Sequence, residues 1–139
     1  MDAKVAERIQ ASFQAQSMMC LINAEISNID IGAVEIQAPI ADSTLQQQSF
    51  AHAGLAFTLG DSAAGFSALT MLGADQEVVT SEMKIHLLRP GTGKFLIARG
   101  RVIKAGQRLV VAAADVYDNQ GGQEKLMATL LGTIVPTPV

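Results

Sequence analysis

The sequence has few of the residues that support disulfide, metal or redox chemistry. It contains one cysteine, two histidines and no tryptophan in 139 residues. Because Cys20 is alone, no intrachain disulfide can form, and no group of cysteine and histidine has the spacing of a metal site. We therefore expect a protein of a reducing compartment that uses no metal and no other cofactor.

Charged residues are also scarce, at 17% of the chain with a formal net charge of −3. No run of lysine and arginine forms the basic stripe that nucleic-acid binding requires, so we expect no nucleic-acid partner. Hydrophobic residues make up 49% of the sequence, which excludes a disordered chain and is enough to fill a core. No repeat or linker divides the chain, so one domain over residues 1–139 is expected.

The first ten residues mix acidic and basic side chains and lack the apolar stretch of a signal peptide, which favours a cytoplasmic location.

The longest apolar stretch covers residues 50–72, FAHAGLAFTLGDSAAGFSALTML, and carries Asp61 at its centre. A carboxylate at the centre of a membrane-spanning helix costs roughly 2.5 to 3.5 kcal/mol, so we do not expect a membrane span. The alternative is a helix that is apolar on every side because protein surrounds it. Its many glycines and alanines allow strands or a partner helix to approach closely. The sequence therefore predicts a long central helix in the core, with a buried carboxylate.

Downstream of this helix, polar and apolar residues alternate as in strands. In residues 80–88, TSEMKIHLL, the side chains of Met83, Ile85 and Leu87 point to one face and those between them to the other. The same kind of pattern predicts a helix over residues 5–13, a strand pair over 21–29 and 33–40, a hairpin over 94–104 and 108–118, and a last strand over 124–135 that Pro136 and Pro138 end. The expected fold class is α+β, with an antiparallel sheet wrapped around the long helix.

Two blocks of the sequence resemble one known family. Residues 52–65, HAGLAFTLGDSAAG, resemble the signature HGG(x)xxxLxDxAxG of the hotdog-fold acyl-CoA thioesterases, of the phenylacetate-degradation and 4-hydroxybenzoyl-CoA thioesterase type. Residues 78–135 are similar to the strand block of that family, so the resemblance covers most of the chain. It implies a hotdog fold, hydrolysis of acyl-CoA to free acid and CoA, and assembly as a homodimer or homotetramer.

The resemblance also implies roles for individual residues. Asp61 matches the catalytic acidic residue, which acts as nucleophile or general base. Ala53 stands where the family has a glycine whose backbone N–H polarises the thioester carbonyl, and Thr80 matches a residue that holds water or substrate. The family's loop asparagine is absent, and this chain offers only glutamines there. The expected substrate-binding residues are Gln46, Gln48, His52, Gly54, Ser62, Ser81 and Arg89, with Gln47 beside them in the loop and Arg89 a candidate for a CoA phosphate.

Two parts of this hydrolytic chemistry follow from the residues themselves, independently of the family resemblance. Free N–H groups at a helix start are donors for the negative charge that a thioester oxygen develops on attack. A carboxylate buried in apolar surroundings is a stronger base than an exposed one. His52 and Asp61 are nine residues apart, which places them on opposite helix faces about 13 Å apart in rise, so they form no catalytic pair. A capping role is expected for His52.

Three alternatives remain open at this point. Asp61 can be a structural residue held by neighbouring hydroxyl or backbone groups. The protein can bind acyl-CoA without turnover. A hotdog enoyl-CoA hydratase needs a histidine a few residues after the aspartate on the same helix, and residues 61–71 contain none. The acyl group cannot be predicted, because the depth of its pocket depends on how two subunits meet.

Overall fold

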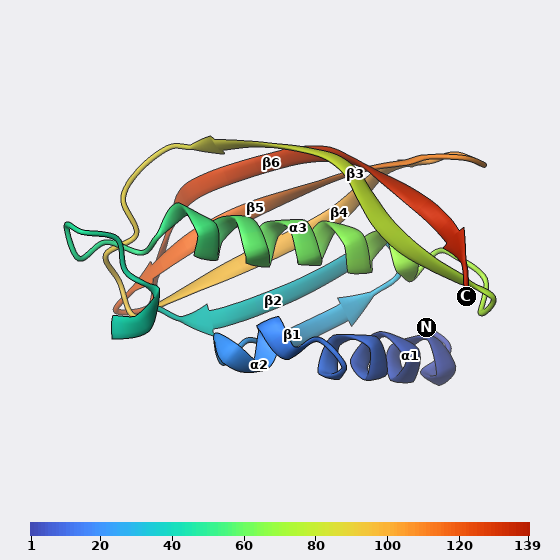
Figure 1. Ribbon diagram of the computed structural model, residues 1–139, viewed down its shortest axis with the longest axis horizontal. Coiled ribbons are helices and arrows are strands. Elements are labelled where there is room, and N and C mark those ends of the chain that lie inside the picture. The colour runs from blue at the N-terminus through green and yellow to red at the C-terminus, as the bar shows by residue number, and fades with distance from the viewer.

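A long helix, α3, lies in the concave face of an antiparallel sheet in the computed structural model, which describes residues 1–139 (Figure 1). The six strands pair in the order β1-β2-β4-β5-β6-β3, so β1 and β3 are the two edges. This arrangement confirms the expected α+β hotdog fold. The elements are α1 (Ala3–Gln14), α2 (Ser17–Leu21), β1 (Glu25–Asp30), β2 (Ala33–Pro39), a 3-10 turn η1 (Asp42–Thr44), α3 (Ala53–Leu69), β3 (Gln76–Leu87), β4 (Phe95–Ala105), β5 (Val110–Gln120) and β6 (Gln123–Pro138).

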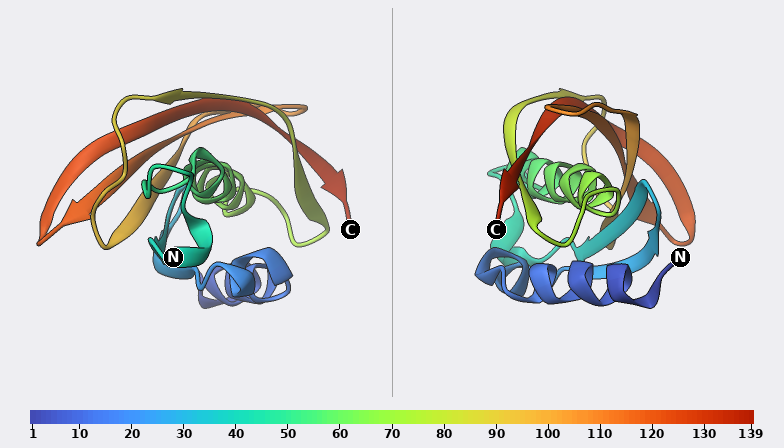
Figure 2. Two further views of the ribbon diagram at one scale, coloured as in Figure 1. Left: turned by 60° about the vertical axis from the view of Figure 1, so that its left-hand side comes forward. Right: turned by 90° about the vertical axis from the view of Figure 1, so that its right-hand side faces the viewer.

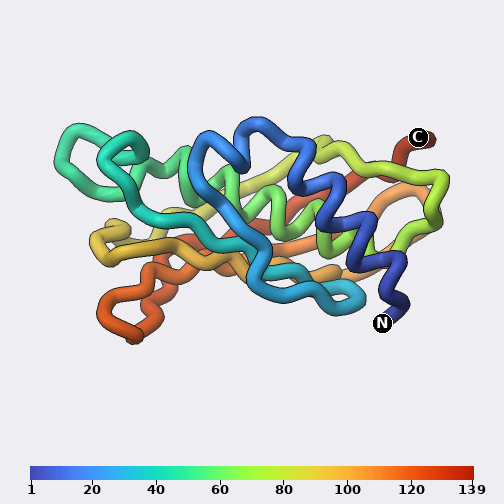
Figure 3. Tube along the Cα trace, turned by 90° about the horizontal axis from the view of Figure 1, so that it is seen from below, coloured from blue at the N-terminus to red at the C-terminus, as the bar shows by residue number.

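The N-terminal helices form a layer of their own. Figure 2 shows the sheet curving over α3 while α1 and α2 lie on the opposite side of it, and Figure 3 shows the same segment from below. Phe13 of α1 packs on Phe66 of α3 with ring centroids 6.0 Å apart. Arg8 donates hydrogen bonds to the carbonyls of Leu72 and Gln76, just beyond α3. The α3 helix is therefore held between the sheet and α1.

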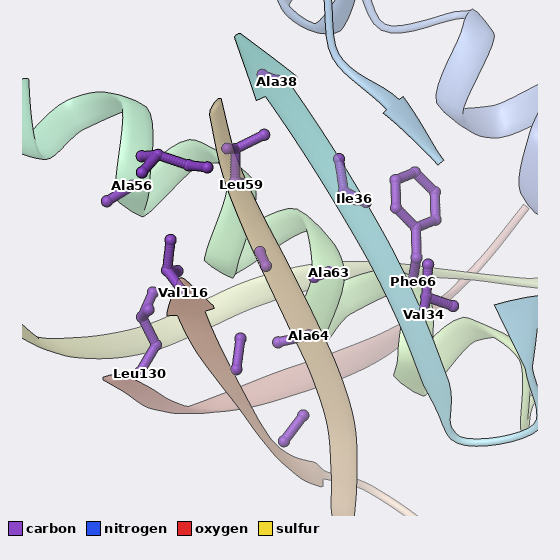
Figure 4. Packing of buried hydrophobic residues seen from close by; sticks show 14 of the residues in the cluster. Val34, Ile36, Ala38, Ala56, Leu59, Ala63, Ala64, Phe66, Val116 and Leu130 are labelled. Carbon is purple, nitrogen blue, oxygen red and sulfur yellow. The ribbon is translucent and has the colours of Figure 1, made fainter. Parts of the chain in front are cut away.

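Small residues let the sheet approach α3 closely. Side chains of α3 such as Leu59 meet Val116 and Leu130 from the sheet in one apolar cluster (Figure 4). A Cβ atom at Gly60 would lie 2.6 Å from a methyl carbon of Leu130. A Cβ at Gly100 of β4 would lie 2.2 Å from the Ala63 carbonyl oxygen. Both glycines are required by close packing, and the composition of the helix suggested this for Gly60.

The α3 helix is not enclosed on every side, which corrects the sequence-based expectation. Its exposed residues include Ala53, Gly54 and Phe57, and Asp61 is half-buried instead of buried. The reason is that a curved sheet and one helix layer leave an open strip along α3 between α1 and β3. No helix of the structure combines the length and the apolar character that crossing a bilayer requires.

Two element boundaries also differ from the sequence-based prediction. Residues 17–21, at whose end a strand was expected to begin, form the short helix α2. Strand β6 continues through Pro136 and Pro138, so the prediction that these prolines end the regular structure was wrong. The last residue of β6 opposite β5 is Ile134, and beyond it β6 has only β3 as a neighbour. A proline is tolerated there because one side of the strand needs no donor.

The outer face of the sheet carries ion pairs that lie away from α3. Arg99 bonds to Glu124 and lies 3.1 Å from Glu35, with its guanidinium over the ring of Tyr117. The hydrogen bond that Arg99 donates holds the pKa of Glu124 below its ordinary value, and the same bond raises the pKa of Arg99. These charges link β4 to its neighbour β2 and, across β5, to β6, and they are separate from the strip of α3 that is open.

A buried carboxylate in β5 holds the segment between β3 and β4. Asp118 is fully buried and accepts the backbone N–H groups of Thr92 and Gly93, each at 2.9 Å. It also accepts a hydrogen bond from the Gln120 side chain. The adjacent Gly91 carbonyl accepts the N–H of Ala51 at 2.9 Å, two residues before α3. Asp118 thus anchors a segment that in turn holds the start of α3.

We expect Asp118→Asn to lower the free energy of unfolding by about 1 to 2 kcal/mol, because the amide turns a donor toward backbone N–H groups that then lose an acceptor. Urea unfolding followed by circular dichroism measures this change. Asp75→Asn is the matched control, since the exposed Asp75 side chain accepts no hydrogen bond. Equal stability of the two variants would show that Asp118 does not anchor the segment.

Candidate active site

The start of α3 presents one unused backbone donor. His52 precedes the helix, and its Nδ1 accepts the N–H of Gly54 at 2.8 Å, so it has the capping role expected from the sequence. The carbonyl of His52 accepts the N–H of Leu55 at 2.9 Å. The N–H of Ala53 has no acceptor, and Ala53 is exposed. At the positive end of the helix dipole, this N–H is suited to bind a carbonyl oxygen that gains negative charge.

The carboxylate of Asp61 lies two turns further along α3. Thr80 of β3 donates its hydroxyl to Oδ1 of Asp61 at 2.7 Å, and Oδ2 accepts no hydrogen bond. Both residues line a polar pocket of about 200 Å³ together with Ser62. The structure therefore brings together three of the residues expected at the site, and it leaves one oxygen of the carboxylate free to act as a base or nucleophile.

A β-bulge directs Thr80 toward Asp61. Met83 and Ile85 pack against the core, and strict alternation from them would turn Thr80 to the outer face of the sheet. The pairing of β3 with β6 shifts register between Thr80 and Glu82. This shift adds one residue and reverses the alternation, so that Thr80 faces α3. The contact between Thr80 and Asp61 depends on this irregularity.

Other expected residues gather on the far side of the helix start. Gln46, Gln48 and Arg89 line a depression of about 380 Å³ with Ala53, while Gln47 is exposed outside it. The side-chain oxygen of Gln46 accepts the backbone N–H groups of Gln48 and Phe50, and its amide nitrogen donates to the side-chain oxygen of Gln48. Gln46 is thus engaged within its own loop, and the Gln48 amide nitrogen stays available as a donor.

Several expected residues lie apart from these two clusters. His52 and Gly54 face a third depression, which α2 borders, so His52 and Asp61 form no pair. Ser81 occupies the bulge and donates to the carbonyl of Thr133 at 3.4 Å, away from the Asp61 pocket. Within one chain, eight residues of helix separate Ala53 from Asp61, which is about 12 Å of rise.

Sequence reasoning missed three polar residues that line the Asp61 pocket. Glu77 of β3 lies there, Ser12 comes from the last turn of α1, and Gln16 comes from the turn between α1 and α2. No local pattern marks them, because they reach the pocket only through the docking of α1 on α3 and the extension of β3 upstream of residue 80. All three lie within reach of the open strip of α3.

Comparisons with known proteins agree with this architecture. A thioesterase family protein from Silicibacter pomeroyi, solved by crystallography, superposes with a TM-score of 0.94 at 32% identity, over 97% of this chain and 99% of that one. A Bacillus halodurans protein solved with CoA superposes with a TM-score of 0.79 at 26% identity, over 96% of this chain and 85% of that one. A protein of Saccharolobus solfataricus named as a candidate esterase is 30% identical over 114 residues, which is 82% of this chain and 73% of that protein.

The sequence model of the thioesterase superfamily matches residues 48–125, more than half of the chain, and this range contains the start of α3, Asp61 and Thr80. The structural likeness extends over nearly the whole chain. These findings confirm the resemblance seen in the helix signature and the strand block. The chain therefore belongs to the thioesterase superfamily and has its hotdog fold.

Proposed function

We propose that this protein hydrolyses acyl-CoA thioesters to the free acid and CoA. The observation that carries the proposal is the pair of groups that α3 presents: the N–H of Ala53, which has no acceptor, and the carboxylate of Asp61, which has one free oxygen. One can stabilise a developing oxyanion and the other can activate the attack. The presence of CoA in the Bacillus halodurans relative supports CoA as the leaving group.

The reaction can follow either of two routes from Asp61. As a general base, the carboxylate removes a proton from water while the water oxygen bonds to the thioester carbon; the C–S bond then breaks and CoA leaves as a thiolate, which takes up a proton. As a nucleophile, Asp61 bonds to the carbon itself and expels the thiolate, and water then hydrolyses the mixed anhydride. In both routes the Ala53 N–H donates to the carbonyl oxygen as it gains charge.

Two subunits are required for these groups to meet at one carbonyl. About 12 Å of helix rise separates Ala53 from Asp61 in one chain, whereas reacting groups need to lie within about 3.5 Å. A two-fold axis across the open strip of α3 would place Asp61 opposite the Ala53 of a partner subunit. The exposed Phe57 on this strip, at 36% exposure, supports a second subunit there.

The neighbouring residues receive supporting roles in this proposal. Thr80 fixes the rotamer of Asp61 through its hydrogen bond, and Ser62 lines the same pocket, whereas Ser81 is turned toward Thr133 and receives no role. Gln48 offers its free amide nitrogen at the helix start, next to the loop that Gln46 stabilises. The guanidinium of Arg89 is exposed at the same depression and suits a phosphate of CoA.

The direct test is turnover of a panel of acyl-CoAs, with release of the thiol as the signal. We expect at least one medium-chain or aromatic acyl-CoA to be hydrolysed without added metal, because the proposed chemistry uses only the amide and the carboxylate. The measurement is repeated after treatment with a chelator. Strict dependence on a divalent ion would contradict this mechanism, and tight binding of acyl-CoA without turnover would indicate a binding protein instead. A hydratase is not favoured, because α3 carries no histidine after Asp61.

A further inference from the structure

The pocket beside Asp61 is larger and more polar than the proposed reaction has so far required. Its volume is about 200 Å³, which is room for several waters. Only two of its nine lining residues are hydrophobic. A polar space of this kind disfavours a hydrocarbon chain, because polar side chains would lose their hydrogen bonds to water there. The pocket therefore suits a small polar molecule.

The pocket also lies on the side of the thioester from which attack has to come. In the proposed reaction, the carbonyl oxygen binds the Ala53 N–H of a second subunit, and the new bond to the carbonyl carbon forms on the side of Asp61. Thr80 already occupies one oxygen of the Asp61 carboxylate. A water in the pocket can donate one hydrogen to the other oxygen, but its orientation stays free until its second hydrogen finds an acceptor.

Two residues of the N-terminal segment reach this pocket with free polar side chains. Ser12 belongs to the last turn of α1, and Gln16 follows four residues later, in the turn before α2. The Gln16 side chain makes no capping hydrogen bond to α2, so its amide group is available. Its side-chain oxygen can accept the second hydrogen of a water that Asp61 holds by the first.

The packing of α1 fixes these side chains relative to Asp61. The ring centroid of Phe13, the neighbour of Ser12, lies 6.0 Å from that of Phe66 on α3. At the other end of α1, Arg8 donates two hydrogen bonds to backbone carbonyls beyond α3. Because α1 is attached to α3 at both points, it can serve as a rigid wall of the pocket.

Gly65 of α3 leaves space in the pocket one turn after Asp61. It is buried and lines the pocket. Outside the helix itself, the nearest atom that an added Cβ would meet is Cγ2 of Val78 at 4.0 Å, which is an ordinary contact. An alanine would therefore fit, and it would favour the helix more than glycine does. The space that Gly65 leaves next to the carboxylate accounts for a glycine at this position.

We propose that this pocket binds the attacking nucleophile and that Gln16 and Ser12 are positioning residues that orient it on Asp61, an inference that rests on the proposed acyl-CoA hydrolysis. Since the pocket holds more than one water, a small alcohol can replace the water, and the protein then transfers the acyl group to the alcohol. Asp61 takes the hydroxyl proton while the alcohol oxygen bonds to the thioester carbon. The C–S bond breaks, the CoA thiolate takes up a proton, and the products are an ester and CoA.

The test measures how the acyl group is divided between water and methanol. The best acyl-CoA of the panel is turned over with and without added methanol, and the acid and the methyl ester are quantified by mass spectrometry, with Asp61→Asn as the background. In the wild-type protein we expect methyl ester above that background.

Gln16→Leu should affect the two nucleophiles differently, because water has a second hydrogen to place and methanol has none. We expect hydrolysis to fall by about tenfold, with KM for the acyl-CoA within about twofold, and the ratio of ester to acid to rise at least about threefold. Gln14→Leu is the matched control, since Gln14 is exposed at the end of α1. That variant should keep the wild-type rate and ratio.

Gly65→Ala separates the role of the pocket from the stability of the fold. We expect this variant to have a higher Tm, because alanine favours the helix, and yet a kcat lower by about fivefold or more, because the added methyl group displaces the nucleophile. The loss in kcat should be the same for short and long acyl chains.

Three results would overturn the inference alone, in a wild-type protein that hydrolyses acyl-CoA. They are the absence of methyl ester above background, an unchanged rate and ratio in Gln16→Leu, and a loss in Gly65→Ala that is confined to long acyl chains, since the pocket would then bind the acyl group. If the wild-type protein hydrolyses no thioester, the proposed function itself fails, and this inference fails with it.

Discussion

Asp61→Asn is expected to lower kcat by at least about 10²-fold while the fold is kept, because the amide has the shape of the carboxylate but cannot act as base or nucleophile. The amide oxygen can still accept the hydrogen bond from Thr80, so the side chain should stay in place. The measurement is steady-state turnover of the best acyl-CoA from the panel, with thermal unfolding as the check on the fold.

Asp75→Asn is the control for a general effect of removing one negative charge, since Asp75 is exposed in the turn before β3. We expect that variant to retain the wild-type rate. If Asp61→Asn also retains it, Asp61 is a structural residue that anchors β3 through Thr80, and the catalytic role proposed for the carboxylate is wrong.

The second expected result concerns the helix start. Ala53→Pro should lower kcat by about 10² to 10³-fold, because it removes the single free N–H that can bind the oxyanion. Proline is tolerated at the first position of a helix, and the residue before it needs an extended backbone. His52 has φ −62° and ψ 141°, which meets that need. The variant is therefore expected to fold.

Mixing the two inactive variants tests whether the site is shared between subunits. In a mixed dimer, Asp61 of the Ala53→Pro chain meets the intact helix start of the Asp61→Asn chain, so one of the two sites works. Random exchange makes about half of the dimers mixed, so about a quarter of the wild-type activity should return. Exchange is followed with two different affinity tags.

Exchange without recovered activity would show that Asp61 and the helix start act within one protomer or do not act together. Lys104→Ala in one of the two chains is a useful further control, because the Lys104 side chain is exposed near the end of β4. Recovery should not depend on it. Recovery of about a quarter of the activity requires an intact Asp61 on one chain and an intact Ala53 N–H on the other.

The central helix could be predicted from the sequence because the features that define it lie on neighbouring residues. Residues 53–69 are small or apolar, Asp61 interrupts them, and His52 stands at the capping position, so the start of α3 and the order of its groups follow from chain spacing. The paired strands and the hotdog fold were predictable for the same reason, since alternation is a property of neighbouring residues.

The surroundings of Asp61 depended on contacts between distant segments. Strict alternation in β3 would have turned Thr80 outward, and only the register shift against β6 directs it to the carboxylate. The role of Asp118 was also invisible in the sequence, because its partners Thr92 and Gly93 are about 25 residues away along the chain.

The sequence by itself determined which groups α3 carries and in what order, because helix geometry converts spacing along the chain directly into position. The tertiary structure alone decided what surrounds them: a half-buried Asp61 bonded to Thr80, an N–H of Ala53 left without an acceptor, and a polar pocket beside Asp61 that α1 borders. The physical reason is that burial and pocket shape are set by how α1, α2 and the curved sheet pack on α3. These contacts join segments that are distant in the sequence, so no local pattern predicts them.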